Sequence, residues 1–521
     1  MLDASAPAPA KSAFMWFKEI YSTCLLVFCS VVVITTMFQM NTTLSTQSGW
    51  IALGIFLISL YWLSMVEGGQ ASLVGLPPVD QNMYKESHPM AFRIMSTIKE
   101  GDCLDRYLMG RQFLVLALVF VENLCAHAID PEKKILGMPL IVNKMFIDTG
   151  LGVFFMTAMI GKISAQVNAS RCMLDYVNNY FAYFTMQVAR IIEVSGLLHC
   201  CYPVQMIFAK LSGQPLVSKE APRTTGQNVF FWLRVLISTA ILMFSFAVTL
   251  SALFNGQTTM WAGVPEWLTV VLFFSFMSVV GMLEGMQIAF FAVAQMRKED
   301  LEVSPWAKKT VNVLFAKEGR NIPAFMIGRQ MCVTLCFFII ARVTTVKLKD
   351  NDDNIFGVSV GAQKFFETGL LGALITTIVA SIAWQLVASA FPLAFLSTPL
   401  TYVLLQFCLG LEWTGLCQGS WVIARIHRKL VKFKRDEVYI GTAEERKAQA
   451  QADPKSFDED DERETQVVPG HLYPGPATTP QVAFIPLTRS NSDLNEIEHD
   501  LKEKREQMKR MQMDDDEEME C

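Results

Sequence analysis

The sequence has few charged residues and few histidines for its length. Only 18% of its 521 residues are Asp, Glu, Lys or Arg, and six are His, whereas 52% are hydrophobic. No segment has the metal-ligand spacing of an H-E-x-x-H motif. His127 and His199, the two histidines near apolar segments, have no counterparts elsewhere in the chain. These absences argue against an enzyme, which usually needs an asymmetric set of catalytic groups.

Long apolar runs predict an all-α polytopic membrane protein. A helix needs about 20 mostly apolar residues to cross the hydrocarbon layer. Ten runs are long enough, at about residues 20–40, 50–76, 110–128, 146–166, 183–209, 229–254, 266–296, 325–346, 364–385 and 391–424. No small-residue cleavage site follows the first run, so we do not expect a cleavable signal peptide there.

The charges separate a basic membrane part from an acidic tail. Residues 1–435 contain 34 basic and 26 acidic groups, whereas residues 436–521 contain 10 and 23. A basic cluster directly follows the tenth run: Arg425, Arg428, Lys429, Lys432, Lys434 and Arg435. The positive-inside rule predicts that this cluster is cytoplasmic and close to anionic lipid. Because ten spans are an even number, the N-terminus is then cytoplasmic too.

Cysteine positions agree with that topology. The expected outer loops, near residues 41–49, 129–145, 209–228, 297–324 and 386–390, contain no cysteine. Structural disulfides belong to oxidising compartments. We therefore expect no disulfide framework.

Three pairs of motifs recur in the same order. EGGQ (67–70) matches EGMQ (284–287), and KEGDCLDRYLMGRQ (99–112) matches KEGRNIPAFMIGRQ (317–330). QVARIIEVSGL (187–197) matches QFCLGLEWTGL (406–416). The three offsets are 217, 218 and 219 residues. A near-constant offset over most of the membrane part indicates an internal duplication.

Each copy would contain five spans, so the second copy would enter the membrane from the opposite face. The prediction is a 5+5 inverted-topology repeat, as in many secondary transporters, which bind substrate near mid-membrane where the repeats meet. The predicted organisation is a cytoplasmic N-terminus (1–19), repeat 1 (20–209), an inter-repeat loop (210–228), repeat 2 (229–424), a basic juxtamembrane segment (425–435), a disordered acidic linker (436–490), and a short coiled coil with an acidic tail (491–521).

The repeated polar residues are the candidate binding site, because ionisable groups within spans are costly and tend to face a cavity or a partner. Carboxylates and amides together suit a small, neutral, hydroxyl-rich solute, with the arginines pairing with the glutamates. An anion held by the arginines is the alternative. The candidates are Glu67, Gly68, Gln70, Gly110, Arg111, Gln112, Glu284, Gly285, Gln287, Gly328, Arg329 and Gln330.

Several readings of these motifs stay open. The long runs around Glu67 and Glu284 indicate either tilt or, as we favour, a helix broken at the adjacent glycines. Such motifs can also hold helices together. That alternative weighs equally with binding for the secondary candidates Gln187, Glu193, Gln406 and Glu412. Ser195 and Thr414, at matching positions of the third motif pair, are further secondary candidates. Glu122 and Arg342, deep in corresponding spans, are interpreted first as an ion pair.

The paired EGxQ and GRQ motifs resemble those of the silicon (silicic acid) transporters of diatoms. CMLD at Cys172–Asp175 is similar to another motif of that family. The resemblance implies uptake of orthosilicic acid across the plasma membrane, coupled to Na⁺ in marine members, with the GxQ residues as silicic acid ligands. Glu67, Glu284, Ser195 and Thr414 are candidates for a Na⁺ site that the sequence does not assign. A channel is the main alternative; no other cofactor and no nucleic-acid partner are expected.

The loops and the tail carry further patterns. Met90, Ile94, Met95 and Ile98 share one helical face, as do Trp306, Thr310, Val313 and Leu314, which predicts an amphipathic helix in each loop. Leu494, Ile497, Leu501, Lys504, Met508 and Met511 follow an a/d pattern for a short coiled coil. That segment could pair subunits or bind a cytosolic partner.

Overall fold

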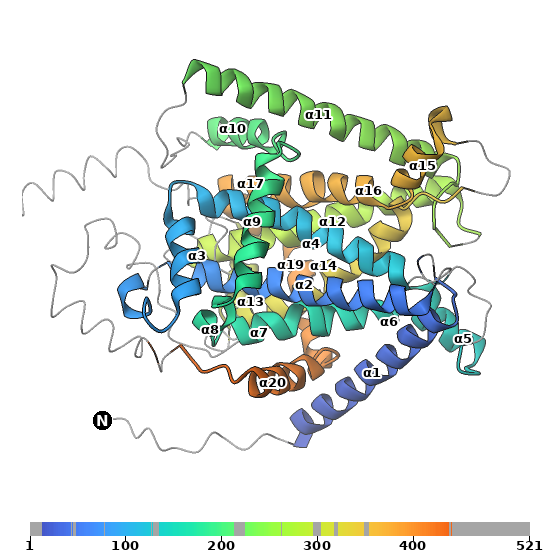
Figure 1. Ribbon diagram of the computed structural model, residues 1–521, viewed down its shortest axis with the longest axis horizontal. Helices are drawn as coiled ribbons and strands as arrows, with labels where there is room; N and C mark the ends of the chain where they lie inside the picture. Colours follow the sequence, from blue (N-terminus) through green and yellow to red (C-terminus); the bar gives the residue numbers. More distant parts are fainter. Residues whose placement is uncertain are drawn as a thin grey trace, which may run out of the picture.

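A computed structural model describes residues 13–42, 44, 48–77, 79–126, 128, 135–212, 224–261, 263–294, 304–316, 321–348, 354–436 and 439. The described chain is helical, with two isolated β-bridges and no named strand (Figure 1). The predicted coiled coil, nearly all of the acidic linker, and His127 lie outside the described residues.

The longest helices are α1 (Ala13–Phe38), α2 (Gly49–Gly75), α4 (Cys103–Ala126), α11 (Thr225–Phe254), α12 (Glu266–Ala294) and α14 (Asn321–Thr344). Two more pass through π-helical segments: α6 (Leu151–Met156), η3 (Thr157–Ile163) and α7 (Ser164–Ala169); and α16 (Leu370–Ile375), η7 (Thr376–Ile382) and α17 (Ala383–Ala390). The others are η1 (Gln81–Met83), α3 (Pro89–Lys99), α5 (Leu140–Asn143), η2 (Lys144–Asp148), α8 (Met173–Val177), α9 (Tyr180–Val194), α10 (Cys201–Ser212), α13 (Pro305–Leu314), η6 (Ile355–Gly357), α15 (Val360–Phe366), α18 (Pro392–Leu396), α19 (Pro399–Thr414) and α20 (Gly419–Val431).

Seven helices of the described chain are long and apolar enough to cross a membrane, and nine are if each of two bent pairs counts as one span. The prediction of a polytopic all-α membrane protein is therefore confirmed, but the ten single spans are not. The run at 183–209 is divided between α9 and α10. The run at 391–424 is divided among α18, α19 and α20, with a 64° bend between the last two. Turns at positive-φ Gly196 and Gly415 interrupt both.

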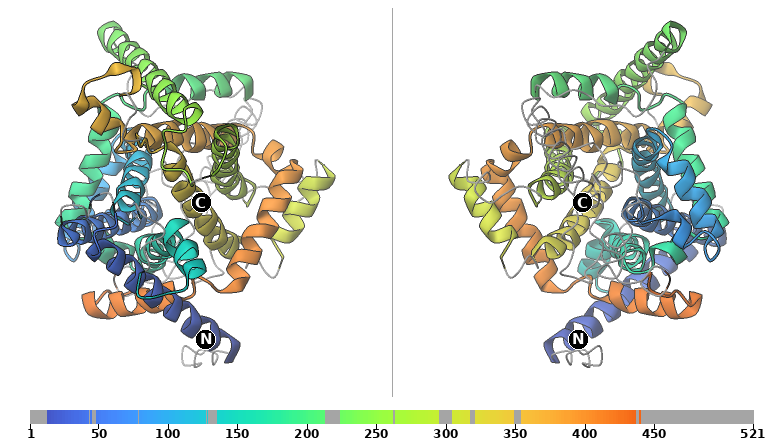
Figure 2. Two further views of the ribbon diagram at one scale, coloured as in Figure 1. Left: turned by 90° about the vertical axis from the view of Figure 1, so that its right-hand side faces the viewer. Right: turned by 90° about the vertical axis from the view of Figure 1, so that its left-hand side faces the viewer.

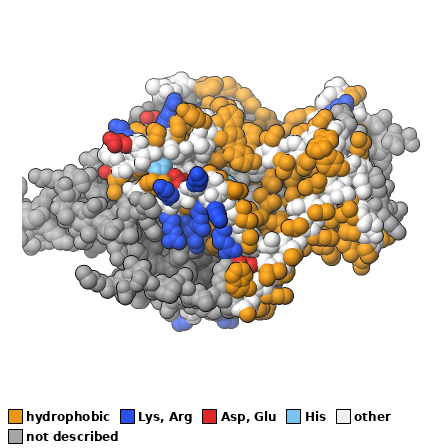
Figure 3. Space-filling view, turned by 60° about the horizontal axis from the view of Figure 1, so that its bottom comes forward, with side chains coloured by type: hydrophobic (Ala, Val, Ile, Leu, Met, Phe, Trp, Pro, Cys, Tyr) orange, Lys and Arg blue, Asp and Glu red, His pale blue; other side chains and the backbone are white. Residues whose placement is uncertain are grey.

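The outer surface is strongly apolar, as expected where helices face lipid. Trp50, Ile58 and Leu236 are between 66% and 73% exposed. Figure 3 shows apolar side chains over much of one face, with Lys and Arg gathered in one region of it. Soluble monomers seldom expose contiguous apolar patches of more than a few hundred Å². The exposed apolar surface thus agrees with a multi-pass membrane protein.

Elements recur along the chain at an offset of 219 residues. The π-helical segment η3 begins at Thr157 and η7 at Thr376; positive-φ glycines precede them at Gly150 and Gly369. π-Helical turns are uncommon and often mark functional sites. The two halves therefore match in local backbone conformation as well as in their sequence motifs.

The first helix of each half contacts the end of the other half. Ser22 on α1 donates to the carbonyl of Leu416 and accepts from the amide of Gly419. In the same way, the Ser238 hydroxyl on α11 donates a hydrogen bond to the carbonyl of Leu197 and accepts one from the amide of Cys200. Accordingly, α20 lies beside α1 on one side of the molecule, and α10 lies near α11 on the opposite side (Figures 1 and 2).

The two amphipathic loop helices are present as α3 and α13, which confirms their prediction. Each begins with a proline in its first turn, where the missing N–H has no intrahelical partner to lose. Their apolar faces are buried against other helices: α3 contacts α4, α8 and α9, and α13 contacts α14, α18 and α19. In α3 the predicted residues Ile94, Met95 and Ile98 are buried. In α13 the buried face is turned from the predicted one, because Ala307 and Val311 are buried with Thr310 and Leu314 whereas Trp306 is exposed.

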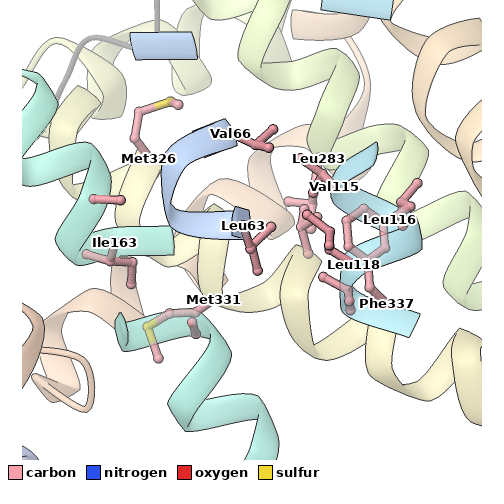
Figure 4. Close-up of a cluster of buried hydrophobic side chains, with 14 of the residues drawn as sticks. Leu63, Val66, Val115, Leu116, Leu118, Ile163, Leu283, Met326, Met331 and Phe337 are labelled. Atoms are coloured by element: carbon pink, nitrogen blue, oxygen red, sulfur yellow. The ribbon is translucent and has the colours of Figure 1, made fainter. Parts of the chain in front are cut away.

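The central helices α2, α4, α12 and α14 share one apolar core. Figure 4 shows Leu63 and Val66 of α2, Val115 of α4, Leu283 of α12 and Phe337 of α14 in one cluster. Each of these side chains is at most 1% exposed. Close packing among the four helices positions the polar side chains that lie among them.

Candidate functional site

One cavity brings the two copies of the polar motifs together. Its lining comes from α2, α4, η3 and α7 of the first half and from α12, α14, η7 and α17 of the second. The polar lining residues are Glu67, Gln70, Arg111, Gln112, Lys162, Gln166, Glu284, Gln287, Arg329, Gln330 and Gln385. Eight of the twelve primary candidates are among them, and only the four glycines are not.

The cavity is small. The volume that the centre of a water-sized sphere can occupy within it is about 30 Å³. One water needs about 10–15 Å³ on this measure. The space therefore suits about two waters, and a solute of five heavy atoms requires the lining side chains to move apart.

Glu67 has three polar partners in the first half. Its carboxylate lies 3.2 Å from Lys162 Nζ and 3.8 Å from Arg111 Nη2, and it accepts a 3.1 Å hydrogen bond from Gln166 Nε2. Glu67 and Lys162 are 3% and 1% exposed. Buried ions are tolerated when they are paired and hydrogen-bonded. Glu67 meets this condition with two cations and one amide.

Glu284 has two such partners in the second half. Arg329 Nη1 lies 3.1 Å from Oε1, and Gln385 Nε2 donates a 2.8 Å hydrogen bond to Oε2. Arg329 also donates to Gln330 Oε1 at 3.1 Å. The expected pairing of arginines with glutamates is thus present in both halves.

A hydrogen bond joins the two halves at the cavity. Gln112 Nε2 on α4 donates to Ser381 Oγ on η7 at 2.7 Å. Phe337 on α14 lies with its ring centroid 5.3 Å from Lys162 Nζ, a cation–π contact across the same boundary. Side chains from both halves therefore hold one another at the site.

The motif glycines have a different role from the one expected. Helices α2 and α12 run without a break through Gly68 and Gly285, so the predicted broken helices are wrong. A Cβ at Gly68 would lie 2.3 Å from the Tyr176 ring, and one at Gly285 would lie 2.4 Å from the Phe395 ring. These glycines allow close packing instead of unwinding.

Glycines of the GRQ motifs serve the same purpose. A Cβ at Gly110 would lie 1.8 Å from the carbonyl oxygen of Ala189, and one at Gly328 would lie 1.9 Å from that of Cys408. Helix α4 can therefore approach α9, and α14 can approach α19, only because these positions lack a side chain. The close approach fixes the neighbouring arginine and glutamine in the cavity.

The secondary candidates lie outside the cavity lining. Glu193 accepts a 2.8 Å hydrogen bond from the Tyr202 hydroxyl, and Gln187 accepts one from Arg190. Ser195 and Thr414 donate to carbonyls one turn earlier at the ends of α9 and α19. Gln406 is exposed, and Glu412 is partly exposed. The contacts of Gln187, Glu193, Ser195 and Thr414 fit the interpretation that these residues hold helices and turns.

The predicted ion pair between Glu122 and Arg342 is wrong. Arg342 Nη2 lies 2.8 Å from Asp148 Oδ1, and Thr157 donates a hydrogen bond to Glu122. Both residues are buried in corresponding helices, but each faces a different neighbour. Depth in a span does not determine which way a side chain points.

Four polar residues at the site were not among the sequence candidates: Lys162, Gln166, Ser381 and Gln385. They pair at an offset of 219, with Lys162 matching Ser381 and Gln166 matching Gln385. The signal available in the sequence was a lysine within a predicted span, which is costly without a partner. Extending the repeat to the fourth span of each half would have found the glutamines.

Cys172–Asp175, the CMLD motif, holds the segment that follows α20. Asp436 accepts backbone hydrogen bonds from Met173 at 2.8 Å and Leu174 at 2.9 Å. Asp175 accepts one from the amide of Lys434 at 2.6 Å and lies 3.1 Å from His88 Nε2. Burial raises the pKa of the Cys172 thiol to about 11, which disfavours the reactive thiolate. The motif thus holds residues 434–436 in place through backbone hydrogen bonds, and we call this set of contacts the clasp.

Buried, paired charges around a cavity between two sets of apolar helices are typical of membrane transport proteins. The sequence model of the silicon transporter family matches residues 10–520, and the chain belongs to that family. Neither the curated proteins nor the solved structures contain a match. The protein is a multi-pass membrane protein of a family of transporters, for which silicic acid is the implied substrate.

Proposed function

We propose that this protein takes up orthosilicic acid, with the cavity between the two halves as its binding site. Silicic acid is uncharged near neutral pH and has four hydroxyl groups. Six glutamines line the cavity. Four of them belong to the repeated motifs and offer amide oxygens and N–H groups to such a solute: Gln70, Gln112, Gln287 and Gln330. Both glutamates are already paired with cations. These neutral amides, together with two glutamates that are each paired with a cation, are the observation that carries the proposal.

We infer that transport proceeds by alternating access between two inverted five-span halves. The matched hydrogen bonds of Ser22 and Ser238, the matched π-helical segments and the matched motifs support this arrangement. Separation of the two halves would enlarge the small cavity for binding and release of the solute. Rocking of one repeat against the other would expose the site to each side in turn.

Coupling to Na⁺ is part of the proposal. Membrane potential alone cannot concentrate an uncharged solute, whereas each co-transported charge adds about 2.3 kcal/mol per 100 mV. We place the protein in the plasma membrane with both termini cytoplasmic. Arg425 in the middle of α20 pairs with Glu19 of α1 at 2.9 Å, which supports both termini lying on the same side of the membrane.

An anionic solute is the second candidate, because the cavity lining carries three cations and two anions: Arg111, Lys162 and Arg329 against Glu67 and Glu284. Coordination of an oxyanion by arginine would be strong and bidentate. The excess of one positive charge is the observation that supports an anion as the second candidate.

Uptake into proteoliposomes tests the proposal. Purified protein should accumulate silicic acid only with an inward Na⁺ gradient, and germanic acid should compete whereas a small carboxylate should not. Gln70→Ala and Gln287→Ala should each lower uptake at least tenfold without lowering the yield of folded protein. Equilibration without a gradient would favour a channel, and competition by the carboxylate would favour the anion.

A further inference from the structure

The two carboxylates of the site differ at one matched position. Residue 162 in η3 and residue 381 in η7 occupy the same place in matching π-helical segments. The first is Lys and the second is Ser. Lys162 Nζ lies 3.2 Å from Glu67, whereas Ser381 accepts hydrogen bonds from Gln112 at 2.7 Å and Gln385 at 3.5 Å.

This substitution changes the charge of one half only. Glu67 lies with Arg111 and Lys162, so the first group has a net charge of +1. Glu284 lies with Arg329, so the second group is neutral. A small monovalent cation beside Glu284 would give the second group the same charge as the first.

The oxygens needed for such a cation are adjacent. Gln385 Nε2 lies 2.8 Å from Glu284 Oε2 and 3.5 Å from Ser381 Oγ, so one amide group bridges the carboxylate and the hydroxyl. Arg329 contacts the other carboxylate oxygen, Oε1. Rotation of the Gln385 amide would present its oxygen as a third ligand. Carboxylate, hydroxyl and amide oxygens are hard ligands that suit Na⁺.

We propose that Lys162 is a resident cation that occupies the first carboxylate site, and that Na⁺ binds in the second half to Glu284, Ser381 and Gln385. This inference rests on the proposed Na⁺-coupled function and adds a location to it. Phe337 and Glu67 hold the Lys162 ammonium from both halves, and Lys162 is only 1% exposed. In this proposal the Lys162 ammonium balances the charge of Glu67, as a bound Na⁺ balances that of Glu284.

Binding of ²²Na⁺ to the purified full-length protein tests the inference, with choline replacing Na⁺ to keep ionic strength constant. Ser381→Ala should weaken Na⁺ binding at least tenfold. Ser278→Ala makes the same chemical change at an exposed position of α12, where the hydroxyl bonds only to the Phe274 carbonyl at 2.8 Å, and should leave binding unchanged. Equal affinity in Ser381→Ala and the wild type would overturn the site.

Exchange of the two residues tests the role of Lys162 directly. Lys162→Ser leaves Glu67 with the partners that Glu284 has, so the maximum amount of bound Na⁺ per protein should double. Ser381→Lys should abolish binding, and the double exchange Lys162→Ser/Ser381→Lys should restore it. An unchanged Na⁺ stoichiometry in Lys162→Ser would overturn the proposed role.

Silicic acid uptake, measured in the same preparations, separates this inference from the proposed function. Uptake by a wild-type protein that binds no Na⁺ would overturn the cation site and leave silicic acid transport standing. Na⁺ binding that follows the predicted variants, without any silicic acid uptake, would retain the cation site and overturn the proposed function.

Discussion

Glu67 and Glu284 occupy matching positions on α2 and α12, but their surroundings differ. Both residues are at most 6% exposed, and both have an arginine partner. Only Glu67 has a lysine as well. The comparison teaches that a shared helical frame can be kept while one substitution, Lys162 against Ser381, changes the electrostatics of the site.

A second difference lies near residues 172–175. In the first half these residues, Cys172–Asp175, hold Asp436 and the amide of Lys434. The matching segment of the second half reads Phe391, Pro392, Leu393 and Ala394 and has no carboxylate. The clasp is therefore a feature of one half, like the lysine.

The largest expected effect comes from filling the helix contacts that both halves share. Gly110→Ala and Gly328→Ala each place a Cβ under 2 Å from a backbone oxygen, so the helices must separate. We expect a cost above the 1–3 kcal/mol typical of overpacking and loss of folded protein. Yield after size-exclusion chromatography measures this.

Gly54→Ala and Gly410→Ala are matched controls, because nothing lies within 4 Å of a Cβ at either position. Alanine is favoured over glycine in a helix by about 1 kcal/mol, so these variants should fold at least as well as the wild type. A normal yield of Gly110→Ala would contradict the packing role.

The next effect would distinguish the two carboxylates. Glu67→Gln leaves Lys162 and Arg111 buried with no anion in the first group, and breaking a buried pair costs about 3–5 kcal/mol. Glu284→Gln leaves one cation, Arg329, which still donates to Gln330. The Tm of the purified protein should therefore fall further for Glu67→Gln.

Adding Lys162→Met to Glu67→Gln should recover part of that loss, because it removes the uncompensated ammonium. Equal Tm values for Glu67→Gln and Glu284→Gln would show that Lys162 does not distinguish the halves.

A smaller effect is expected at the clasp. Asp436→Ala removes the acceptor for two backbone amides, those of Met173 and Leu174. Hydrogen bonds to a charged acceptor contribute about 1.5–3 kcal/mol each. Hydrogen exchange at residues 173–177 should accelerate at least tenfold, while exchange in the matching residues 392–396 stays unchanged. Unchanged exchange at 173–177 would argue against the clasp.

Asp436 also predicts a pH dependence. Burial raises its pKa above the usual carboxyl value, so the folded protein holds this proton more tightly than the unfolded chain. Stability from this group therefore decreases as pH rises from the usual carboxyl pKa through the raised one. Asp436→Asn, which does not titrate, should show a flatter dependence of Tm on pH; an identical dependence would contradict the shift.

The smallest effect concerns thiol reactivity. Because the pKa of Cys172 is raised to about 11, its alkylation rate should keep rising tenfold per pH unit above pH 9, where an ordinary thiol of pKa about 8.5 levels off. Mass spectrometry of the Cys172 peptide measures this. A plateau near pH 9 would show that the thiol is not buried as described.

Much of the site was predictable because its polar motifs occur twice in the sequence. The glutamates, arginines and glutamines of the two motif pairs were candidates from the sequence, and the cavity contains them all. The same logic misread the glycines, since Gly68 and Gly285 suit both an unwound helix and a close contact. Only the rings of Tyr176 and Phe395 distinguish these alternatives.

What the sequence by itself determined is the all-helical membrane class and the polar groups placed within the helices, since run length and apolar content decide which segments can lie in lipid. Only the tertiary structure decided which partner each buried charge has. Rotation of a helix about its axis turns a side chain toward a different neighbour without changing the apolar run. Lys162 reaches Glu67, and Arg342 reaches Asp148 instead of Glu122, because of how the helices pack.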